Sequence, residues 1–291
     1  MGPGEGGGAV AYRRVVRLCL GPRAFDVTTR ALVMGILNRT TDSFFDRGEH
    51  FAMDRFLVRA EQLVAEGADV LDVGGVKAGP GPEVTAEEEL DRVIPAVTAL
   101  ADRFDVAISV DTWRAEVARS AFAAGASVGN DISGFADPAY LTAAAEAGAA
   151  VVATHIRLLP RIPDPRPRYD DVVATVSDEL VALARRAEHA GIPADRIMVD
   201  AGLDLGKTAE QSLELLRASH HLAAIGWPLL LSASNKTFLG ALLHLDIDSR
   251  REASLSAAAL GVKLGCRVIR AHDVLGTRRV CDTLDAVLSA Q

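Results

Sequence analysis

Four polar side chains that suit a flat, nitrogen-rich heterocycle follow short apolar runs of this sequence. The carboxylates of Asp111 and Asp200 can accept hydrogen bonds from a ring N–H and an exocyclic amine. The Asn130 amide and the Lys236 ammonium can donate to a carbonyl group. An amino-pyrimidinone edge, such as that of a pterin, would satisfy all four. An aspartate that follows a strand is, by itself, more often the N-cap of a helix, so the hypothesis requires that the four lie together.

A second set of residues offers hydrogen-bond donors and positive charge. It comprises Asn38, Arg270, His272 and the glycine-rich segment 74–81. Arginine makes planar bidentate contacts with phosphate, and glycine-rich backbone can bring its N–H groups close to an anion. The sequence therefore predicts a phosphate or pyrophosphate subsite beside the heterocycle subsite.

Both sets must be positioned by a repeating unit that begins near residue 31. Each unit has a short apolar run and then a longer segment with apolar residues at three- and four-residue spacing, which is typical of an amphipathic helix. The runs are continuous rather than alternating, as in parallel strands covered on both faces. The predicted strands are 31–37, 68–73, 106–110, 126–130, 149–153, 196–199, 228–232 and 267–271. The predicted helices are 54–66, 87–103, 114–124, 171–190, 210–225 and 254–264.

Eight such units, each of about 34 residues, favour a closed (β/α)8 TIM barrel. An open doubly wound sheet is the alternative, but no predicted strand leads into a Gly-x-Gly-x-x-Gly turn. Active sites of barrels lie at the carboxyl ends of the strands, where the polar residues above are found. Two apolar segments around Gly21-Pro22 predict an N-terminal β-hairpin. We expect a flexible glycine-rich tail at 1–12 and a single domain over 13–291.

Composition narrows the class of protein. The 291 residues are 49% hydrophobic and carry a net charge of −8, which argues against a nucleic-acid partner. No apolar run reaches the roughly 18–20 residues of a membrane span, and no signal peptide is evident, so we expect a cytoplasmic protein without a membrane partner. Cys19, Cys266 and Cys281 lack C-x-x-C spacing, which argues against a disulfide framework and against a zinc site.

The segment 157–168 combines four prolines with four arginines. Proline favours an extended backbone, and the position after the strand 149–153 places this segment at the rim of the barrel. It is interpreted either as a stiff solvated loop or as a basic flap for an acidic substrate or a protein partner.

Over residues 13–288 the sequence resembles the dihydropteroate synthase family of pterin-binding TIM barrels. The most specific stretches are 34–38 with 42–44, 67–72 with 74–75, 109–112, 130–131, Asp200 with Gly202 and 206–207, Ser234 with 236–240, and Arg270 with 272–274. The resemblance implies a transferase of folate biosynthesis that condenses 6-hydroxymethyl-7,8-dihydropterin diphosphate with p-aminobenzoate, giving 7,8-dihydropteroate and diphosphate. It also implies Mg²⁺ as cofactor, a homodimer, and a hairpin that closes the bottom of the barrel.

The resemblance further implies roles for individual residues. The pterin would be held by Asp111, Asn130, Asp200 and Lys236, and the diphosphate by Asn38, Arg270 and His272, with Mg²⁺ beside Asn38. The catalytic residues would be Lys236, Asp42, Arg270 and His272, and the arylamine site would include Ser234, Leu205 and Lys77.

Departures from the family pattern cluster at the arylamine positions. Ala78 and Gly79 stand where the family has Thr and Arg, so the usual partner of Asp42 is missing; Lys77 could substitute, without the planar fork of arginine. Leu205 replaces a Phe, Asn235 an Arg, and Thr154 a Met.

Three functions therefore remain open. The first is an active dihydropteroate synthase. The second is a catalytically weak or inactive pterin-binding paralogue with a different acceptor or a regulatory role. The third, a pterin-dependent methyltransferase, shares the Asp and Asn pocket but does not explain Lys236 together with Arg270 and His272.

Overall fold

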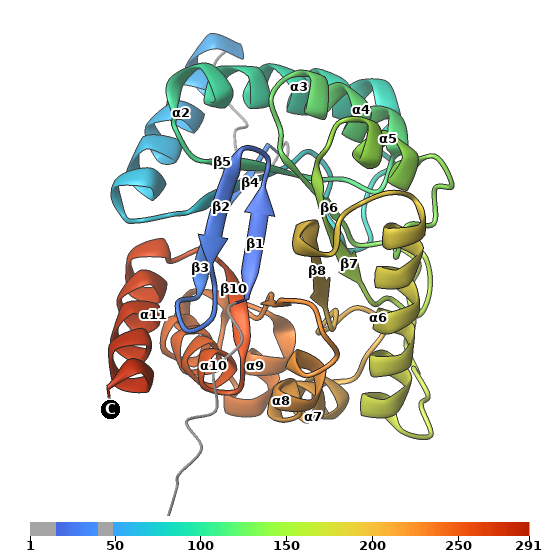
Figure 1. The fold of residues 1–291 in the computed structure, drawn as a ribbon, viewed down its shortest axis with the longest axis vertical. Coiled ribbons are helices and arrows are strands. Elements are labelled where there is room, and N and C mark those ends of the chain that lie inside the picture. Colours follow the sequence, from blue (N-terminus) through green and yellow to red (C-terminus); the bar gives the residue numbers. More distant parts are fainter. Residues whose placement is uncertain (1–15, 40–48, 291) are drawn as a thin grey trace, which may run out of the picture.

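The computed structural model describes residues 16–39 and 49–290, and eight parallel strands form a closed barrel at its centre (Figure 1). Their order around the barrel is β10-β3-β4-β5-β6-β7-β8-β9, so each strand pairs with its neighbour in sequence and the last pairs with the first. The strands are β3 (Leu32–Asn38), β4 (Val70–Gly74), β5 (Ala107–Asp111), β6 (Val128–Asp131), β7 (Ala150–Thr154), β8 (Ile197–Asp200), β9 (Leu229–Leu231) and β10 (Cys266–Ala271). The predicted barrel and all eight predicted strands are confirmed.

Helices surround the barrel (Figure 1). They are α2 (Glu49–Ala65), α3 (Ala86–Arg103), α4 (Ala115–Ala123), α5 (Tyr140–Glu146), α6 (Val172–His189), α7 (Ala209–Arg217), α8 (Ser219–Ala223), α9 (Thr237–Leu243), α10 (Arg251–Lys263) and α11 (Val274–Ser289). Several begin at side-chain caps, including a capping box of Thr85 with Glu88 at α3 and the Asp273 carboxylate at α11.

The prediction of one helix over 210–225 is wrong. The chain forms α7 and α8, which meet at Ala218, where the backbone leaves the helical conformation. The Ser219 hydroxyl donates to the Leu216 carbonyl oxygen at 2.7 Å. Such short-range side-chain bonds compete with the helical pattern, and apolar spacing alone does not register them.

The N-terminal hairpin consists of β1 (Arg17–Leu20) and β2 (Arg23–Asp26), and Gly21 adopts a positive φ of 62° at its turn. Leu18, Leu20 and Val27 are fully buried against inward-facing residues near the starts of the barrel strands, such as Met34 and Val70. The hairpin lies across this opening in Figure 1. It therefore closes the bottom of the barrel, as expected; the predicted tail at 1–12 lies outside the described residues.

Alternation along the strands separates two cores. In β3 and β4, Val33 and Leu71 pack with the surrounding helices, while Met34 and Val70 fill the barrel interior. The same alternation directs Asp72, Asn130, Asp200 and Arg270 into the interior at the carboxyl ends of their strands. The sequence pattern thus places the polar side chains in the mouth opposite the hairpin.

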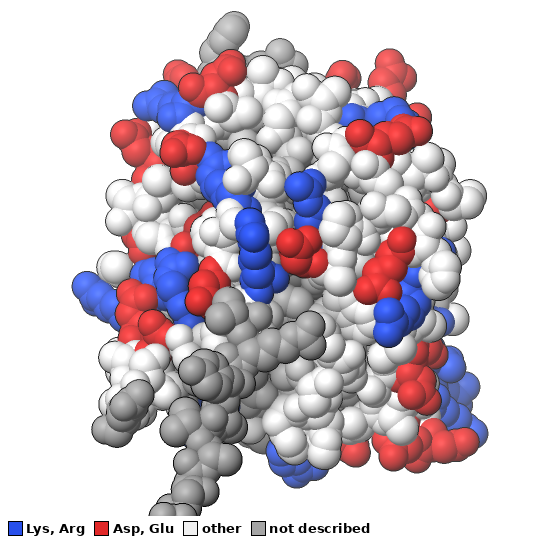
Figure 2. Space-filling view, in the orientation of Figure 1, with Lys and Arg blue, Asp and Glu red and all other residues white. Residues whose placement is uncertain are grey.

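The surface on the hairpin side mixes acidic and basic side chains (Figure 2). Its visible part carries no continuous basic patch, in keeping with the net charge of −8. Among the described residues, no helix is both long enough and apolar enough to cross a membrane. The three cysteines are buried free thiols.

Candidate active site

The centre of the mouth is a network around the guanidinium of Arg270. Its Nε atom donates to Oδ2 of Asp72 at 2.6 Å, and its Nη2 atom donates to Oδ2 of Asp111 at 2.8 Å. The Asn130 amide nitrogen donates to Oδ2 of Asp72 at 3.2 Å. Residues from β4, β5, β6 and β10 therefore meet at one point. Three of them, Asp111, Asn130 and Arg270, were predicted from the sequence to lie together at the strand ends.

Asp72 is a site residue that the sequence reasoning did not single out. Its side chain is fully buried and binds both Arg270 and Asn130. The sequence does contain a signal that could have identified it, because Asp72 is a charged residue within an otherwise apolar run, two positions before Gly74. A carboxylate in the interior of a barrel requires a partner of opposite charge, which Arg270 supplies.

Burial changes the protonation of this network. It raises the pKa of Asp111 to about 7, an effect that Arg270 opposes and that the nearby Asp72 carboxylate reinforces. The pKa of Arg270 is raised, because the attraction of Asp72 and Asp111 exceeds the opposing effect of burial. One cation is thus shared by two acids, and burial favours the neutral form of Asp111.

Asp200 and Lys236 lie on the opposite side of the mouth. Oδ1 of Asp200 accepts the backbone N–H of Gly202 at 2.8 Å, which fixes the orientation of the carboxylate. The Lys236 ammonium donates to the Leu203 carbonyl oxygen at 2.6 Å. Burial raises the pKa of Asp200 and lowers that of Lys236, and each partly offsets this effect on the other through its charge. Together, the Asp200 carboxylate offers an acceptor and the Lys236 ammonium offers a donor to a polar ligand.

Lys207 organises the loop behind Asp200. Its ammonium contacts Nδ1 of His155 at 2.9 Å and donates to the carbonyl oxygens of Gly202 and Leu205 at 2.9 and 3.0 Å. Burial, followed by repulsion from Lys236, lowers the pKa of Lys207 to about 7. Burial and then Lys207 lower the pKa of His155 to about 3, so His155 is a neutral hydrogen-bonding residue of the scaffold.

The predicted anion subsite joins the ends of β3, β9 and β10. His272 Nδ1 lies 3.0 Å from the Ser234 hydroxyl, and Arg59 on α2 donates to the His272 carbonyl oxygen at 3.0 Å. Burial, then Arg270 and Arg59, lower the pKa of His272 to about 4. Ser234, His272 and Arg270 line a cavity of about 430 Å³ that extends between α2 and α10. Ser234, predicted for the arylamine site, therefore lies on the anion side of the mouth.

Asn38 is the last residue of β3, in register with Gly74 of β4. Its Oδ1 atom lies 3.5 Å from the position that a Cβ on Gly74 would occupy, so the glycine leaves room beside the amide. Asn38 thus stands on the side of the mouth where an anion or its counter-ion would bind. Asp42 lies outside the described residues.

A second cavity, also of about 430 Å³, lies between the glycine-rich loop and segment 157–168. Ala78, Gly79, Leu205, Lys207 and Lys236 are among its lining residues. Leu205, predicted for the arylamine site, lines this cavity, while Lys77 is exposed and absent from the lining.

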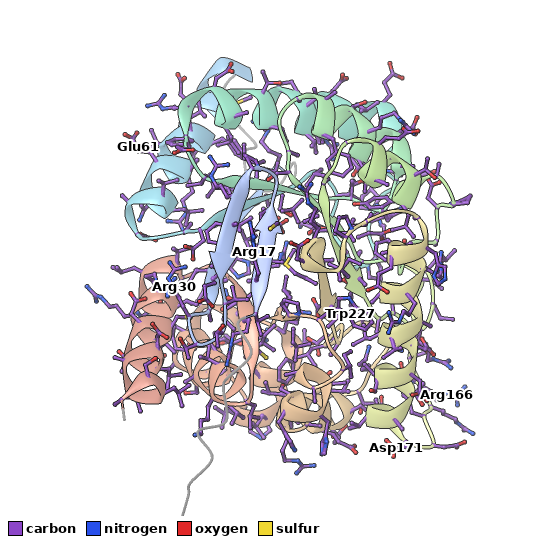
Figure 3. All side chains as sticks on the ribbon, viewed as in Figure 1. Arg17, Arg30, Glu61, Arg166, Asp171 and Trp227 are labelled. Atoms are coloured by element: carbon purple, nitrogen blue, oxygen red, sulfur yellow. The ribbon has the colours of Figure 1, made fainter. Side chains whose placement is uncertain are left out.

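Segment 157–168 forms the outer wall of this second cavity. Arg157 pairs with Asp164 within the segment, and Arg161 donates to the Pro82 carbonyl oxygen on the glycine-rich loop. Leu159 and Ile162 are exposed apolar residues that line the cavity. Arg166, in contrast, lies at the outer edge of the molecule near Asp171 at the start of α6 (Figure 3). Arg161 thus ties the segment to the glycine-rich loop, while Arg166 takes no part in the lining of the cavity.

Comparison with known proteins shows which family this chain is similar to. Residues 34–272 match the family model described as pterin binding enzyme. The chain is 45% identical to a protein of Mycobacterium leprae named inactive dihydropteroate synthase 2, with 93% of this chain and 94% of that protein covered. It is 39% identical to the dihydropteroate synthase of Escherichia coli, with 89% and 92% covered.

Solved structures give the same result. A Yersinia pestis dihydropteroate synthase with a sulfonamide drug complex superposes with a TM-score of 0.88 at 36% identity, covering 94% of this chain and 100% of that one. A Xanthomonas albilineans dihydropteroate synthase with 4-aminobenzoic acid gives a TM-score of 0.87 at 36% identity, covering 95% and 100%.

Proposed function

The chain belongs to the family of pterin-binding enzymes, and from this premise we propose that it condenses a dihydropterin diphosphate with p-aminobenzoate. One observation carries the proposal above all. The mouth of the barrel holds the buried Asp200 and Asn130 and the half-buried Lys236 as acceptors and donors, beside a rim that offers Arg270 and His272 for an anion. This arrangement suits a ligand with a polar heterocycle at one end and a diphosphate at the other.

Each side chain has a definite task in this proposal. The Asp200 carboxylate accepts N–H groups of the heterocycle, and Lys236 donates to its carbonyl oxygen. Arg270 holds Asp72 and Asp111 in place and presents its positive charge toward the rim. The network is thus assembled before the ligand arrives, which lowers the cost of ordering it on binding.

The reaction breaks one bond and forms another. The C–O bond to the diphosphate breaks with its electron pair on the departing oxygen, and the arylamine nitrogen forms the new C–N bond. That nitrogen then gives up a proton to the released diphosphate or to water. His272, neutral in the free protein, can donate its Nε2 hydrogen to the diphosphate while Nδ1 contacts Ser234. The contribution of the protein is electrostatic stabilisation of the leaving group.

We also propose Mg²⁺ beside Asn38. Among the described residues, no group of three His, Cys, Asp or Glu side chains could hold a metal ion. A single carboxamide oxygen fits Mg²⁺, which keeps several waters and takes most of its remaining ligands from substrate phosphates. When bound, the ion would neutralise charge on the departing diphosphate.

A homodimer in the cytoplasm belongs to the same proposal. Leu242, Leu243, Leu260 and Leu275, from α9, α10 and α11, are exposed apolar side chains that an interface could cover. Light scattering on the purified protein would measure the mass directly, and a mass of 30.7 kDa at micromolar concentration would contradict the dimer.

A second candidate function is pterin binding without transfer to p-aminobenzoate. It is favoured by Ala78 and Gly79, which leave the wall of the second cavity without the polar side chains of the family pattern. The names of several relatives agree with it, since proteins 42% to 45% identical to this chain are called inactive dihydropteroate synthase 2.

One experiment separates the two functions. Purified protein is mixed with Mg²⁺, dihydropterin diphosphate and p-aminobenzoate, and dihydropteroate is measured; in parallel, p-aminobenzoate is titrated calorimetrically into protein saturated with Mg²⁺, pyrophosphate and a pterin. Turnover with arylamine binding supports the transferase. If the protein binds pterin but neither forms dihydropteroate nor binds p-aminobenzoate, the second function is supported. The double variant Ala78→Thr, Gly79→Arg should then gain activity.

A further inference from the structure

Asp204 brings a negative charge to the wall of the second cavity. It follows β8 on the loop that carries Gly202 and Lys207, and it lines the cavity together with Lys207, Lys236 and other residues. Asp204 is half-buried, so its carboxylate is only partly screened by water. An acceptor that occupies this cavity would therefore lie close to a carboxylate of the protein.

Hydrogen bonds to the start of α9 hold this carboxylate in place. Its Oδ2 atom accepts the backbone N–H and the hydroxyl of Thr237, both at 2.7 Å, and the backbone N–H of Phe238 at 3.4 Å. Asp204 thus caps a helix that begins 33 residues further along the chain. All of these donors are neutral groups, so they orient the carboxylate without cancelling its charge.

The local backbone does not require a charged residue at this position. Asp204 has a φ of 65°, in the left-handed region that glycine adopts without cost and that asparagine and aspartate adopt more readily than other residues. The side-chain oxygen of an asparagine could accept the same N–H groups. Neither the turn nor the helix cap therefore explains why the side chain is an acid.

The other acid among the lining residues is neutralised by an arginine. Asp164 binds the guanidinium of Arg157, and only 8% of the Asp164 side chain is exposed. Among the described residues that line the second cavity, Asp204 is thus the acid whose direct partners carry no positive charge. Its field acts on whatever else enters the cavity.

The charge of Asp204 already acts on both lysines of the cavity. Burial lowers the pKa of Lys236, and the negative charges of Asp200 and then Asp204 oppose this effect. Burial and then Lys236 lower the pKa of Lys207 to about 7, and Asp204 is again among the acids that oppose the effect. Asp204 therefore offsets positive charge that would otherwise attract a ligand with a carboxylate.

We propose that Asp204 is a specificity-determining residue for the acceptor: its carboxylate weakens the binding of an arylamine that carries a carboxylate, relative to a neutral arylamine of the same shape. The inference rests on the proposed function, because it places the acceptor in the second cavity. Two like charges in a partly buried cavity repel each other, and the hydrogen bonds to α9 keep Asp204 from turning away.

The test compares p-aminobenzoate with p-aminobenzamide, which has nearly the same shape and no charge. Each is titrated calorimetrically at neutral pH into protein saturated with Mg²⁺, pyrophosphate and a pterin. Asp204→Asn keeps the helix cap and removes the charge, so affinity for p-aminobenzoate should rise about three- to thirty-fold. Affinity for p-aminobenzamide should change by less than about two-fold. Added salt should reduce the difference between the two proteins for p-aminobenzoate.

Asp105→Asn is the matched control for the loss of one negative charge. Asp105 pairs with Arg23 of the hairpin, at the opposite end of the barrel, and its side chain is 99% exposed. Both arylamines should bind this variant as they bind the unmodified protein. If p-aminobenzoate gains as much affinity in Asp105→Asn as in Asp204→Asn, the net charge is the cause and the inference is overturned.

The remaining outcomes separate this inference from the proposed function. If the unmodified protein binds no pterin, the proposed function fails and the inference fails with it. If pterin binds but neither arylamine binds any of the proteins, or if Asp204→Asn leaves both affinities unchanged, only the role of Asp204 is overturned. Equal weakening of both arylamines in Asp204→Asn would also overturn it, because Asp204 would then serve only to hold α9 in place.

Discussion

The Nε atom of Arg270 lies 2.6 Å from Oδ2 of Asp72, so the arginine expected to hold diphosphate is joined to the floor of the heterocycle pocket. The same guanidinium reaches Asp111. The two predicted subsites therefore share a residue, and a change at Arg270 acts on both.

Replacement of Arg270 should weaken both ligands. Arg270→Ala leaves the neighbouring carboxylates of Asp72 and Asp111 without a counter-charge. Because the Asn130 amide donates to Asp72, its position should change together with that of the rim. We expect calorimetry to show at least a ten-fold loss of affinity for pyrophosphate and for pterin alike. If pyrophosphate binding is lost while pterin binding is unchanged, the two subsites are independent and this prediction is wrong.

Asp72 should contribute to stability and not only to ligand binding. Asp72→Ala breaks an ion pair whose carboxylate is fully buried and leaves Arg270 with one of its two carboxylate partners, so the free energy of unfolding should fall by about 3 kcal/mol. Urea unfolding followed by circular dichroism measures this. Glu61→Ala, on an exposed pair with Arg103, is the control and should change stability by less than about 1 kcal/mol.

Diphosphate binding should be accompanied by proton uptake at His272. Burial, Arg270 and Arg59 hold the pKa of His272 at about 4 in the free protein, and a bound anion would raise it. Because the bound state then takes up the proton more readily, affinity for pyrophosphate should rise as pH falls through the raised pKa. Calorimetry in buffers of different ionisation enthalpy counts the protons. His272→Gln should bind pyrophosphate with fewer protons taken up, and an unchanged count would exclude His272.

The stability of the ligand-free protein should depend on Lys207 above pH 7. Its pKa is about 7 in the folded state against an ordinary value of 10.5, so between these values the unfolded chain holds more protons. The free energy of unfolding should therefore increase with pH in that window. Lys207→Met removes the titrating group, and its unfolding curves from pH 7 to 10 should show a smaller increase. An identical slope in both proteins would refute this assignment.

Segment 157–168 should affect the acceptor and not the pterin. Arg161 ties the segment to Pro82 beside the second cavity, so Arg161→Ala should raise the KM for p-aminobenzoate several-fold while pterin affinity stays constant. Arg166→Ala, at the outer edge of the molecule, is the matched control and should behave as the unmodified protein. Equal effects of both substitutions would point to the net charge of the segment rather than to Arg161.

The barrel could be predicted because its strands are buried on both faces. Val70, Val73, Val110 and Val128 belong to short apolar runs, which is a local signal that survives without knowledge of tertiary contacts. The helix boundary at Ala218 could not be predicted in the same way. It depends on a side-chain bond of Ser219 to the backbone, which the apolar spacing of 210–225 does not reveal.

The candidate site was predictable at the ends of strands and less so within them. Asp111, Asn130 and Asp200 stand at or next to the last residue of a strand, where a barrel exposes its chemistry. Asp72 lies inside β4, where its charge stands out in an apolar run, but its partner Arg270, 198 residues away, is revealed only by the fold.

The hairpin closes one end of the barrel and so determines from which side a ligand can enter. Leu18 and Leu20 fill the amino-terminal end, so a molecule bound at Asp200 has entered through the rim formed by the glycine-rich loop and segment 157–168. In the proposed reaction, a heterocycle at Asp200 would have to bind before an acceptor occupies the second cavity. In the proposed reaction the product would leave through the same opening, so we expect movement of the rim loops to set the rate of its release.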